Sequence, residues 1–133
     1  MAPEYDRARE FLNLTGIADE VSMMTYGNRR VLVERLPIDV NSSGPTTLVA
    51  ARPGYALVVT AYSYMSNGAV NVHFRSNSAP ITGPSYLPEA GRGKVNPYNP
   101  KGWCATEVGE ALNIHLSAGT AVGGEFTFVA IEV

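Results

Sequence analysis

The segment Tyr55–Ser76, with the sequence YALVVTAYSYMSNGAVNVHFRS, decides the fold class of this 133-residue chain. It contains two apolar-rich runs joined by Ser66-Asn67-Gly68, and Asn-Gly pairs accept the positive φ angles of a tight hairpin turn at low cost. In the second run, Val70–Arg75, apolar and polar side chains alternate, which is the period of a strand with one buried face. The segment therefore predicts a β-hairpin whose first strand covers residues 55–65.

Further strands are predicted on both sides of this hairpin, separated by turns rich in Gly, Pro, Asn and Ser. The candidates are Val31–Leu36, Thr46–Ala51, Ala111–Ser117 and Glu125–Val133. The last of them is apolar on both faces, which is typical of a strand that is central in its sheet or covered by another subunit. Residues 80–102 are rich in proline and predict a loop with at most short edge strands, because proline cannot donate to a β-ladder. We therefore expect an all-β fold, an antiparallel β-sandwich of the jelly-roll-like kind.

The first 28 residues have a different pattern and predict a short N-terminal α-helical extension. Two helices are expected, the second over Ile17–Met24, and each is too short to be stable in water without packing on a sheet or a neighbour. The apolar face of the first helix is formed by Phe11, Leu12 and Leu14. The expected organisation is thus an N-terminal helical arm, residues 1–28, followed by a β-sandwich domain, residues 29–133.

Composition narrows the class of function. Hydrophobic residues make up 45% of the chain and charged residues 17%, with a net charge of −2, so the strong basic excess of a nucleic-acid-binding protein is missing. No apolar run is long enough for a membrane-spanning helix. The acidic start, Met1–Asp6, is unlike a signal peptide, and we expect the protein to act without secretion. The single cysteine, Cys104, excludes an intrachain disulfide and a cysteine-based zinc cage.

Few residues suit catalysis or metal binding. His73 and His115 fall on the polar faces of predicted strands and would converge if those strands were neighbours, but neither face offers an acidic third ligand. We expect surface or interface histidines rather than a metal site. Cys104 has no base close in sequence and is expected to be a structural thiol. Glu107 and Glu110 flank a predicted turn, where carboxylates are usually solvated.

These observations predict no catalytic residue, no cofactor site and no metal site, and so no enzymatic activity. Gly91-Arg92-Gly93-Lys94 is not a P-loop, because Val95 follows the lysine and no helix is expected there. We interpret it as a charged loop tip whose Arg92 and Lys94 meet either an acidic partner surface or solvent.

Aromatic residues carry the interaction hypotheses. Tyr62 and Tyr64 share one face of their strand and could stack sugars, but the favoured interpretation is core or subunit interface. Tyrosine and tryptophan in the loop over residues 80–103 are typical of interfaces. The predicted partner interface consists of Phe11, Leu12, Leu14, Tyr86, Arg92, Lys94, Tyr98 and Trp103.

Turns and alternating strands also carry a family resemblance. The segments concerned are Leu48–Ala51, Ser66–Ser76, Ile81–Pro84, Asn99–Trp103, Gly109–Ile114 and Val122–Phe128. With them the stretch from Thr46 to Val133 resembles a recurrent type of small virion protein of tailed bacteriophages. The resemblance covers about two thirds of the chain and includes no catalytic signature.

The resemblance implies a compact, non-enzymatic β-sandwich, and some such proteins are capsid cement or decoration proteins. The expected partners are then the major capsid protein and further copies of this chain, a trimer above all, with no nucleic acid and no membrane. The expected location is the virion, assembled in the host cytoplasm. An alternative is a carbohydrate- or receptor-binding β-sandwich module of a phage tail or head fibre. A small hydrolase or metal enzyme would require His73, His115 or Cys104 to gather in one cleft with an acid.

Overall fold

The computed structural model describes residues 23–26 and 29–132, and the chain divides into two compact units, residues 1–34 and 35–133. The described part of the first unit is a β-hairpin in which β1, Met23–Tyr26, pairs antiparallel with β2, Arg29–Leu32. The predicted helix over Ile17–Met24 is therefore wrong for its last residues, because Met23 and Met24 belong to β1. Antiparallel pairing with β2 provides hydrogen-bond partners for the backbone of these residues, whereas a short helix has little stability on its own. The remainder of the predicted helical arm, including Phe11, Leu12 and Leu14, lies outside the described residues.

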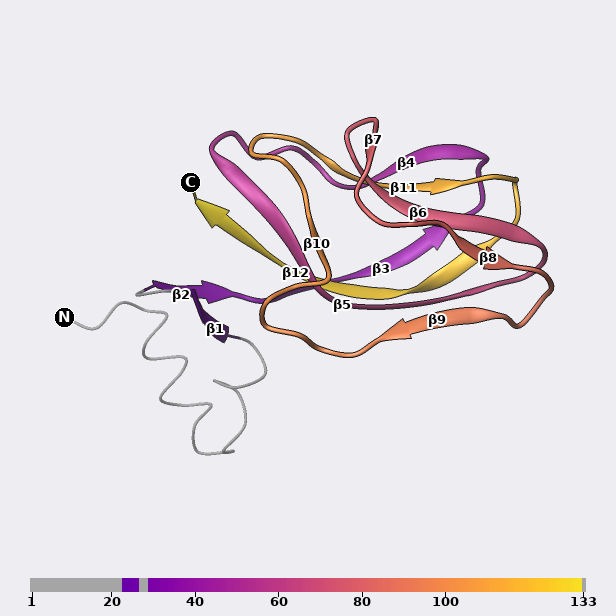
Figure 1. Cartoon of the computed structure of the whole chain (residues 1–133), viewed down its shortest axis with the longest axis horizontal. Coiled ribbons are helices and arrows are strands. Elements are labelled where there is room, and N and C mark those ends of the chain that lie inside the picture. Colours follow the sequence, from indigo (N-terminus) through magenta and orange to yellow (C-terminus); the bar gives the residue numbers. More distant parts are fainter. Residues whose placement is uncertain (1–22, 27–28, 133) are drawn as a thin grey trace. The chain divides into compact units, whose positions relative to one another are not determined.

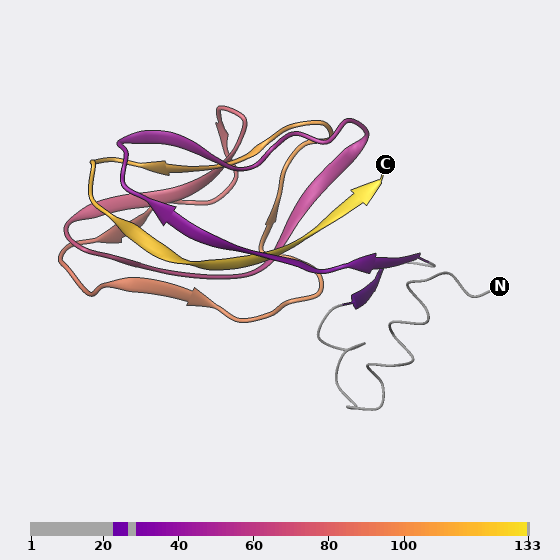
Figure 2. The ribbon, with the colours of Figure 1, turned by 180° about the vertical axis from the view of Figure 1, so that it is seen from behind.

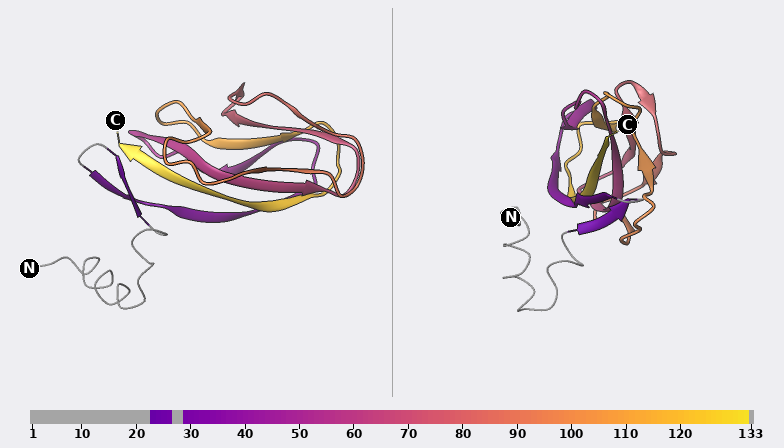
Figure 3. Two further views of the ribbon diagram at one scale, coloured as in Figure 1. Left: turned by 60° about the horizontal axis from the view of Figure 1, so that its bottom comes forward. Right: turned by 90° about the vertical axis from the view of Figure 1, so that its left-hand side faces the viewer.

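The second unit contains two antiparallel sheets that lie face to face (Figures 1 and 3). The β5 sheet has the strand order β10-β5-β12-β3, and β9 also pairs with β5. Its strands are β3 (Glu34–Val40), β5 (Tyr55–Ser66), β9 (Gly93–Asn96), β10 (Cys104–Ala105) and β12 (Val122–Glu132). The β6 sheet has the order β4-β11-β6-β7, and β8 also pairs with β6. Its strands are β4 (Gly44–Val49), β6 (Val70–Ser76), β7 (Ala79–Pro80), β8 (Ser85–Leu87) and β11 (Leu112–Leu116).

These sheets confirm the predicted all-β class and the antiparallel β-sandwich. The chain passes repeatedly from one sheet to the other: β3, β5, β9, β10 and β12 lie in one layer, and β4, β6, β7, β8 and β11 lie in the other. The predicted β-hairpin over Tyr55–Ser76 is wrong: Ser66-Asn67-Gly68 connects β5 to β6, but these strands lie in different sheets and do not pair, because β5 pairs with β9, β10 and β12. Neither Asn67 nor Gly68 adopts the positive φ expected of a hairpin turn, so the turn carries the chain from one sheet to the other. The predicted strand Val31–Leu36 is divided instead between β2 and β3, because β2 pairs with β1 whereas β3 pairs with β12.

The core fills the space between the two sheets. Its largest fully buried side chains include Phe74 of β6 together with Phe126 and Phe128 of β12. The closing strand is central in its sheet, between β5 and β3 (Figure 2), as its apolar faces predicted. Val129 points away from the two phenylalanines and is also fully buried. Tyr62 packs edge-on against Phe74, with ring centres 4.9 Å apart, so the favoured core interpretation of the tyrosine stripe is confirmed.

A bulge in β5 determines which of its side chains face the core. Thr127 of β12 pairs with Ala61, but the next residue, Phe128, pairs with Val59, so Thr60 is an extra residue on β5. An extra residue reverses the in-out alternation of a strand. As a result odd-numbered Val59 and even-numbered Tyr62 both face the core. The hydroxyl oxygens of Thr60 and Thr127 lie 2.8 Å apart in a hydrogen bond across the bulge.

Glycines allow both neighbours of β5 to approach its far end closely. A Cβ atom at Gly124 of β12 would collide with the backbone carbonyl of Ser63, and one at Gly93 of β9 would collide with that of Tyr64. The adjacent Gly123 is different, because a Cβ there would be in ordinary van der Waals contact, 3.7 Å from the carbonyl oxygen of Ile38.

We predict that Gly124→Ala destabilises the sandwich whereas Gly123→Ala does not. Backbone atoms of β5 cannot move without disturbing the core, so the first change should lower the free energy of unfolding by about 2 kcal/mol. The second change should alter it by less than about 0.5 kcal/mol. Urea titrations followed by tryptophan fluorescence measure both values, and equal effects of the two substitutions would contradict the close strand approach.

Candidate functional site

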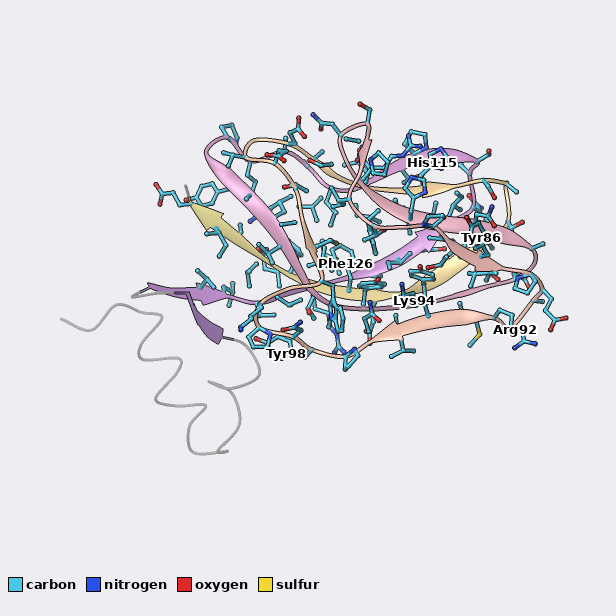
Figure 4. The ribbon with its side chains drawn as sticks, in the orientation of Figure 1. Tyr86, Arg92, Lys94, Tyr98, His115 and Phe126 are labelled. Atoms are coloured by element: carbon cyan, nitrogen blue, oxygen red, sulfur yellow. The ribbon has the colours of Figure 1, made fainter. Side chains whose placement is uncertain are left out.

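The structure places the described members of the predicted partner interface in three separate regions rather than in one surface. Tyr86 lies on β8 in the β6 sheet, whereas Arg92 and Lys94 lie at the start of β9 on the edge of β5. Tyr98 and Trp103 belong to the connection between β9 and β10. In Figure 4, Tyr98 lies at the left of the labelled members, whereas Tyr86 and Arg92 lie at the right.

An apolar strip runs along the outer face of the β5 sheet. We define it by Met65, Val95 and Trp103, whose exposed fractions are 58%, 75% and 42%. Met65 pairs with Gly93, and Ser63 pairs with Val95, so the methionine and the valine are diagonal neighbours on one face. Trp103 follows along the same edge of β5, directly before β10, where its amide donates to the carbonyl of Val59.

A shallow groove of about 130 Å³ opens beside Val95 on this outer face. Its lining includes Ala61 and Thr127 together with an ion pair between Arg35 and Glu125, in which the charged atoms are 2.9 Å apart. The indole nitrogen of Trp103 donates to the carbonyl oxygen of Pro97 at 2.8 Å, and this bond fixes the ring orientation. The strip is therefore a preformed surface of apolar side chains next to a small depression.

Sequence reasoning identified Trp103 of the strip but missed Met65 and Val95. The signal for Met65 was its position between Tyr64 and Ser66, opposite in parity to both, but strict alternation from Tyr55 assigns the wrong face until the bulge is known. Val95 is an isolated apolar residue in a polar loop, which carries no pattern of its own.

The charges at the loop tip have partners within the chain. Arg92 forms an ion pair with Glu89 at 2.9 Å, and both side chains are well exposed. The ammonium group of Lys94 lies 5.9 Å from the centre of the Tyr62 ring. The exposed Arg92–Glu89 pair contributes little stability, about 0–1 kcal/mol, whereas the Tyr62 ring that Lys94 approaches is buried.

Cys104 does not join the histidines. It pairs with Val59 in the β5 sheet and packs against the core between the sheets. Burial raises the pKa of its thiol to about 12, although Lys94 acts in the opposite direction. At neutral pH the group is therefore a protonated thiol, which is a poor nucleophile.

His73 and His115 form a stacked pair on the outer face of the β6 sheet. They are directly opposite each other on β6 and β11, with ring centres 4.9 Å apart (Figure 4 labels His115). The Nε of Arg75 donates to Nε2 of His73 at 2.9 Å. Because Nε2 accepts this bond, the neutral His73 ring carries its proton on Nδ1. Spacing by two residues on one strand was the signal that could have linked Arg75 to His73.

The surroundings of the pair disfavour protonation. Burial, the Arg75 guanidinium and His115 all lower the pKa of His73, in that order of importance. Burial and Arg75 likewise lower the pKa of His115. The two imidazoles meet because β6 and β11 are neighbours, which was the condition stated for their convergence.

Within residues 23–26 and 29–132 no group of three or more His, Cys, Asp or Glu side chains has the arrangement of a metal site. In that same part of the chain, no helix has the length and apolar character needed to cross a lipid bilayer. No protein-family model matches this chain, and no curated protein is similar enough to give a match.

We predict that Cys104 is unreactive in the folded protein. A buried thiol with a raised pKa reacts slowly with a disulfide reagent at about pH 8, because thiolate is the attacking form. The native chain should release no chromophore from Ellman's reagent over minutes, whereas the same chain in guanidinium chloride should react fully. Equal rates in the two states would show that the thiol is accessible.

We also predict that the histidine pair makes stability depend on pH. The pKa of each ring is lower in the folded than in the unfolded chain, where it is about 6.5. The unfolded state therefore binds protons more readily, and the contribution of the pair to stability is present above about pH 6.5 and is lost as the pH falls. The free energy of unfolding should decrease between about pH 7 and pH 5. The double variant His73→Asn/His115→Asn should show a smaller decrease in urea titrations.

Proton NMR titration supplies the control, because the chain has only two histidines. Both rings should titrate below their ordinary pKa, and Arg75→Gln should raise the pKa of both. Lys101→Gln removes an equal charge from a different, exposed loop and should leave both unchanged. An upward shift of either ring in the native chain would contradict the electrostatic account.

Proposed function

We propose that this protein is a non-enzymatic virion structural protein, a capsid cement or decoration protein that oligomerises and binds the major capsid protein. The observation that carries the proposal is the apolar strip formed by Met65, Val95 and Trp103 on the outer face of the β5 sheet. Methionine and tryptophan are enriched in protein interfaces, and well-packed aromatic residues often dominate their binding energy. A neighbouring protein that covers the strip and fills the adjacent groove would remove this apolar surface from water.

The strand connectivity supports the proposal at the level of fold. We classify the sandwich as a jelly roll, with the strand orders β3-β12-β5-β9 in one sheet and β4-β11-β6-β8 in the other. Jelly rolls of eight strands are common in viral capsid proteins and in lectins. This is an analogy of architecture, and the function rests on the surface. The resemblance of residues 46–133 to small virion proteins of tailed bacteriophages points in the same direction.

The mechanism that we propose is stabilisation by mass action. A protein that binds the assembled shell and not its dissociated subunits shifts the equilibrium towards the shell. A closed symmetric arrangement of copies, of which a trimer suits the local threefold axes of an icosahedral shell, would present several strips at once. Such a role requires a rigid scaffold and no catalytic activity.

A carbohydrate-binding module is the second candidate. The exposure of Tyr86, 72%, favours it, because this ring lies beside an open groove on the β6 sheet and is available for stacking. Tyr62 and Tyr64 cannot provide that platform, since both are buried in the core.

We predict that Val95→Glu strongly weakens binding to the shell. A charge in the centre of the strip would be desolvated without a partner, so the affinity should fall at least about tenfold. Binding is measured by co-sedimentation with empty shells assembled from the major capsid protein of the same virus, and self-association by sedimentation equilibrium.

Val108→Glu is the matched control, because Val108 is also an exposed valine but lies in a turn outside the strip. This variant should bind as the original chain does. If the unmodified chain never associates with shells, the cement role is wrong. If both glutamate variants bind normally, the strip is not the contact surface.

A further inference from the structure

We propose that the outer face of the β6 sheet is a binding site for an acidic saccharide, in which Arg75 and the His73–His115 pair recognise a sugar carboxylate and Tyr86 supports a sugar ring. The inference deepens the second candidate function and rests on it. It is independent of the apolar strip, which lies on the other sheet.

The side chains of the proposed site share the outer face of the β6 sheet. Tyr86 of β8 is directly opposite Asn71 of β6, and Asn71, His73 and Arg75 follow one another at intervals of two residues. Side chains at such intervals point to the same side of a strand. From Asn71 to Arg75 the strand rises about 13 Å, so the row has the length of a short oligosaccharide.

Arg75 is held in position by a neutral ring and not by an acid. Its Nε donates to His73, and among the described residues no carboxylate forms an ion pair with it. The terminal nitrogens of the guanidinium group therefore keep their donors for a ligand. A guanidinium group binds a carboxylate through two parallel hydrogen bonds, which is the geometry that best satisfies both groups.

Among the described strands of this face, no acidic side chain lies beside the positive charge of Arg75. The outward-facing residues around the pair are Asn113 of β11, Ser117 directly after β11, Pro45 and Thr47 of β4, and Pro80 of β7. None of them titrates, so among the described residues the ionisable groups on this face are Arg75, the two histidines and Tyr86. When the pH falls, protonation of His115 adds positive charge to this face while the neutral His73 ring still accepts from Arg75, and a bound carboxylate compensates for the repulsion that otherwise opposes protonation.

The other end of the row suits the body of a sugar. Tyr86 borders an open groove of about 340 Å³ that is also lined by Asn71, Ser117 and Pro88. The hydroxyl of Ser117 accepts a hydrogen bond from the backbone amide of Asn71 at 2.8 Å, which joins β6 and β11 along the floor. A flat exposed ring beside an amide and a hydroxyl offers an apolar surface and hydrogen bonds together. An acidic peptide could bind through the positive charge of Arg75 alone and would not require the Tyr86 ring.

Isothermal titration calorimetry with a trisaccharide of galacturonic acid tests the proposal, with a trisaccharide of galactose and a polyglutamate peptide as comparison ligands. The acidic sugar should bind, and its affinity should be higher at about pH 5.5 than at about pH 8 by at least threefold, because a bound carboxylate favours protonation of His115 and this coupling takes effect only as the pH falls. The neutral sugar and the peptide should bind at least about tenfold more weakly.

Variants locate the site. Arg75→Gln and Tyr86→Ala should each weaken binding of the acidic sugar about tenfold or more, whereas Lys101→Gln, which removes an exposed charge elsewhere, should not. Thermal unfolding midpoints establish that each variant is folded. Tyr86 is exposed, so its substitution tests the site even if a change at Arg75 disturbs the histidine pair.

The other outcomes separate the two levels of the proposal. If neutral and acidic sugars bind equally and Arg75→Gln has no effect, the module binds carbohydrate but the acidic site is wrong. If polyglutamate binds as well as the sugar and Tyr86→Ala has no effect, the face recognises acidic protein surfaces and the saccharide proposal is overturned. If none of the ligands binds, both this inference and the second candidate function fail.

Discussion

The pairing of β5 with β12 is the interaction on which the rest of the structure depends. It joins the two longest strands of the described chain, and its register runs from Val122 opposite Ser66 to Glu132 opposite Tyr55. The bulge at Thr60 lies within this pairing. It directs Leu57 and Val59 to the core before the bulge and Tyr62 and Tyr64 after it, so that one strand contributes to the hydrophobic core along most of its length.

The same bulge creates the outer surface. Once Tyr64 faces inward, Met65 must face outward, next to the β9 strand that carries Val95. Without the extra residue the tyrosines would be exposed and the methionine buried. Gly93 and Gly124, which allow β9 and β12 to approach this end of β5, maintain the arrangement because no side chain separates the strands there.

The sequence was sufficient for the class of fold and for most strands, because the alternation in Val70–Arg75 is a local signal. The Asn-Gly pair marked a turn correctly but not a hairpin, since the partners of β5 and β6 are distant in sequence. An assignment of faces by alternation assumes a regular strand, however, and the hydrophobic pattern of β5 does not show the bulge at Thr60. The helix expected up to Met24 was wrong at its C-terminal end because Met23 and Met24 pair with β2, and helix propensity, which is a local property, does not include such pairing between segments.

The candidate sites were predicted less completely, since they depend on which strands are neighbours. The polar parity of His73 and His115 indicated their face, but only the pairing of β6 with β11 brings the rings into contact. The role of Arg75 depends on that pairing too. Likewise Tyr86 and Trp103 are both exposed aromatic residues in one long connection, and only the topology assigns them to different sheets. The sandwich thus presents an apolar surface on one sheet and a basic, polar surface on the other.

Under the proposed function, a density map of the virus particle is the most direct test of the central proposal, that a neighbouring protein covers the outer apolar surface of this protein. The account predicts that the β5 sheet faces the shell and that Met65, Val95 and Trp103 contact a neighbouring subunit. A map in which the protein is present and the apolar strip faces solvent, or in which the particle lacks the protein, would contradict it.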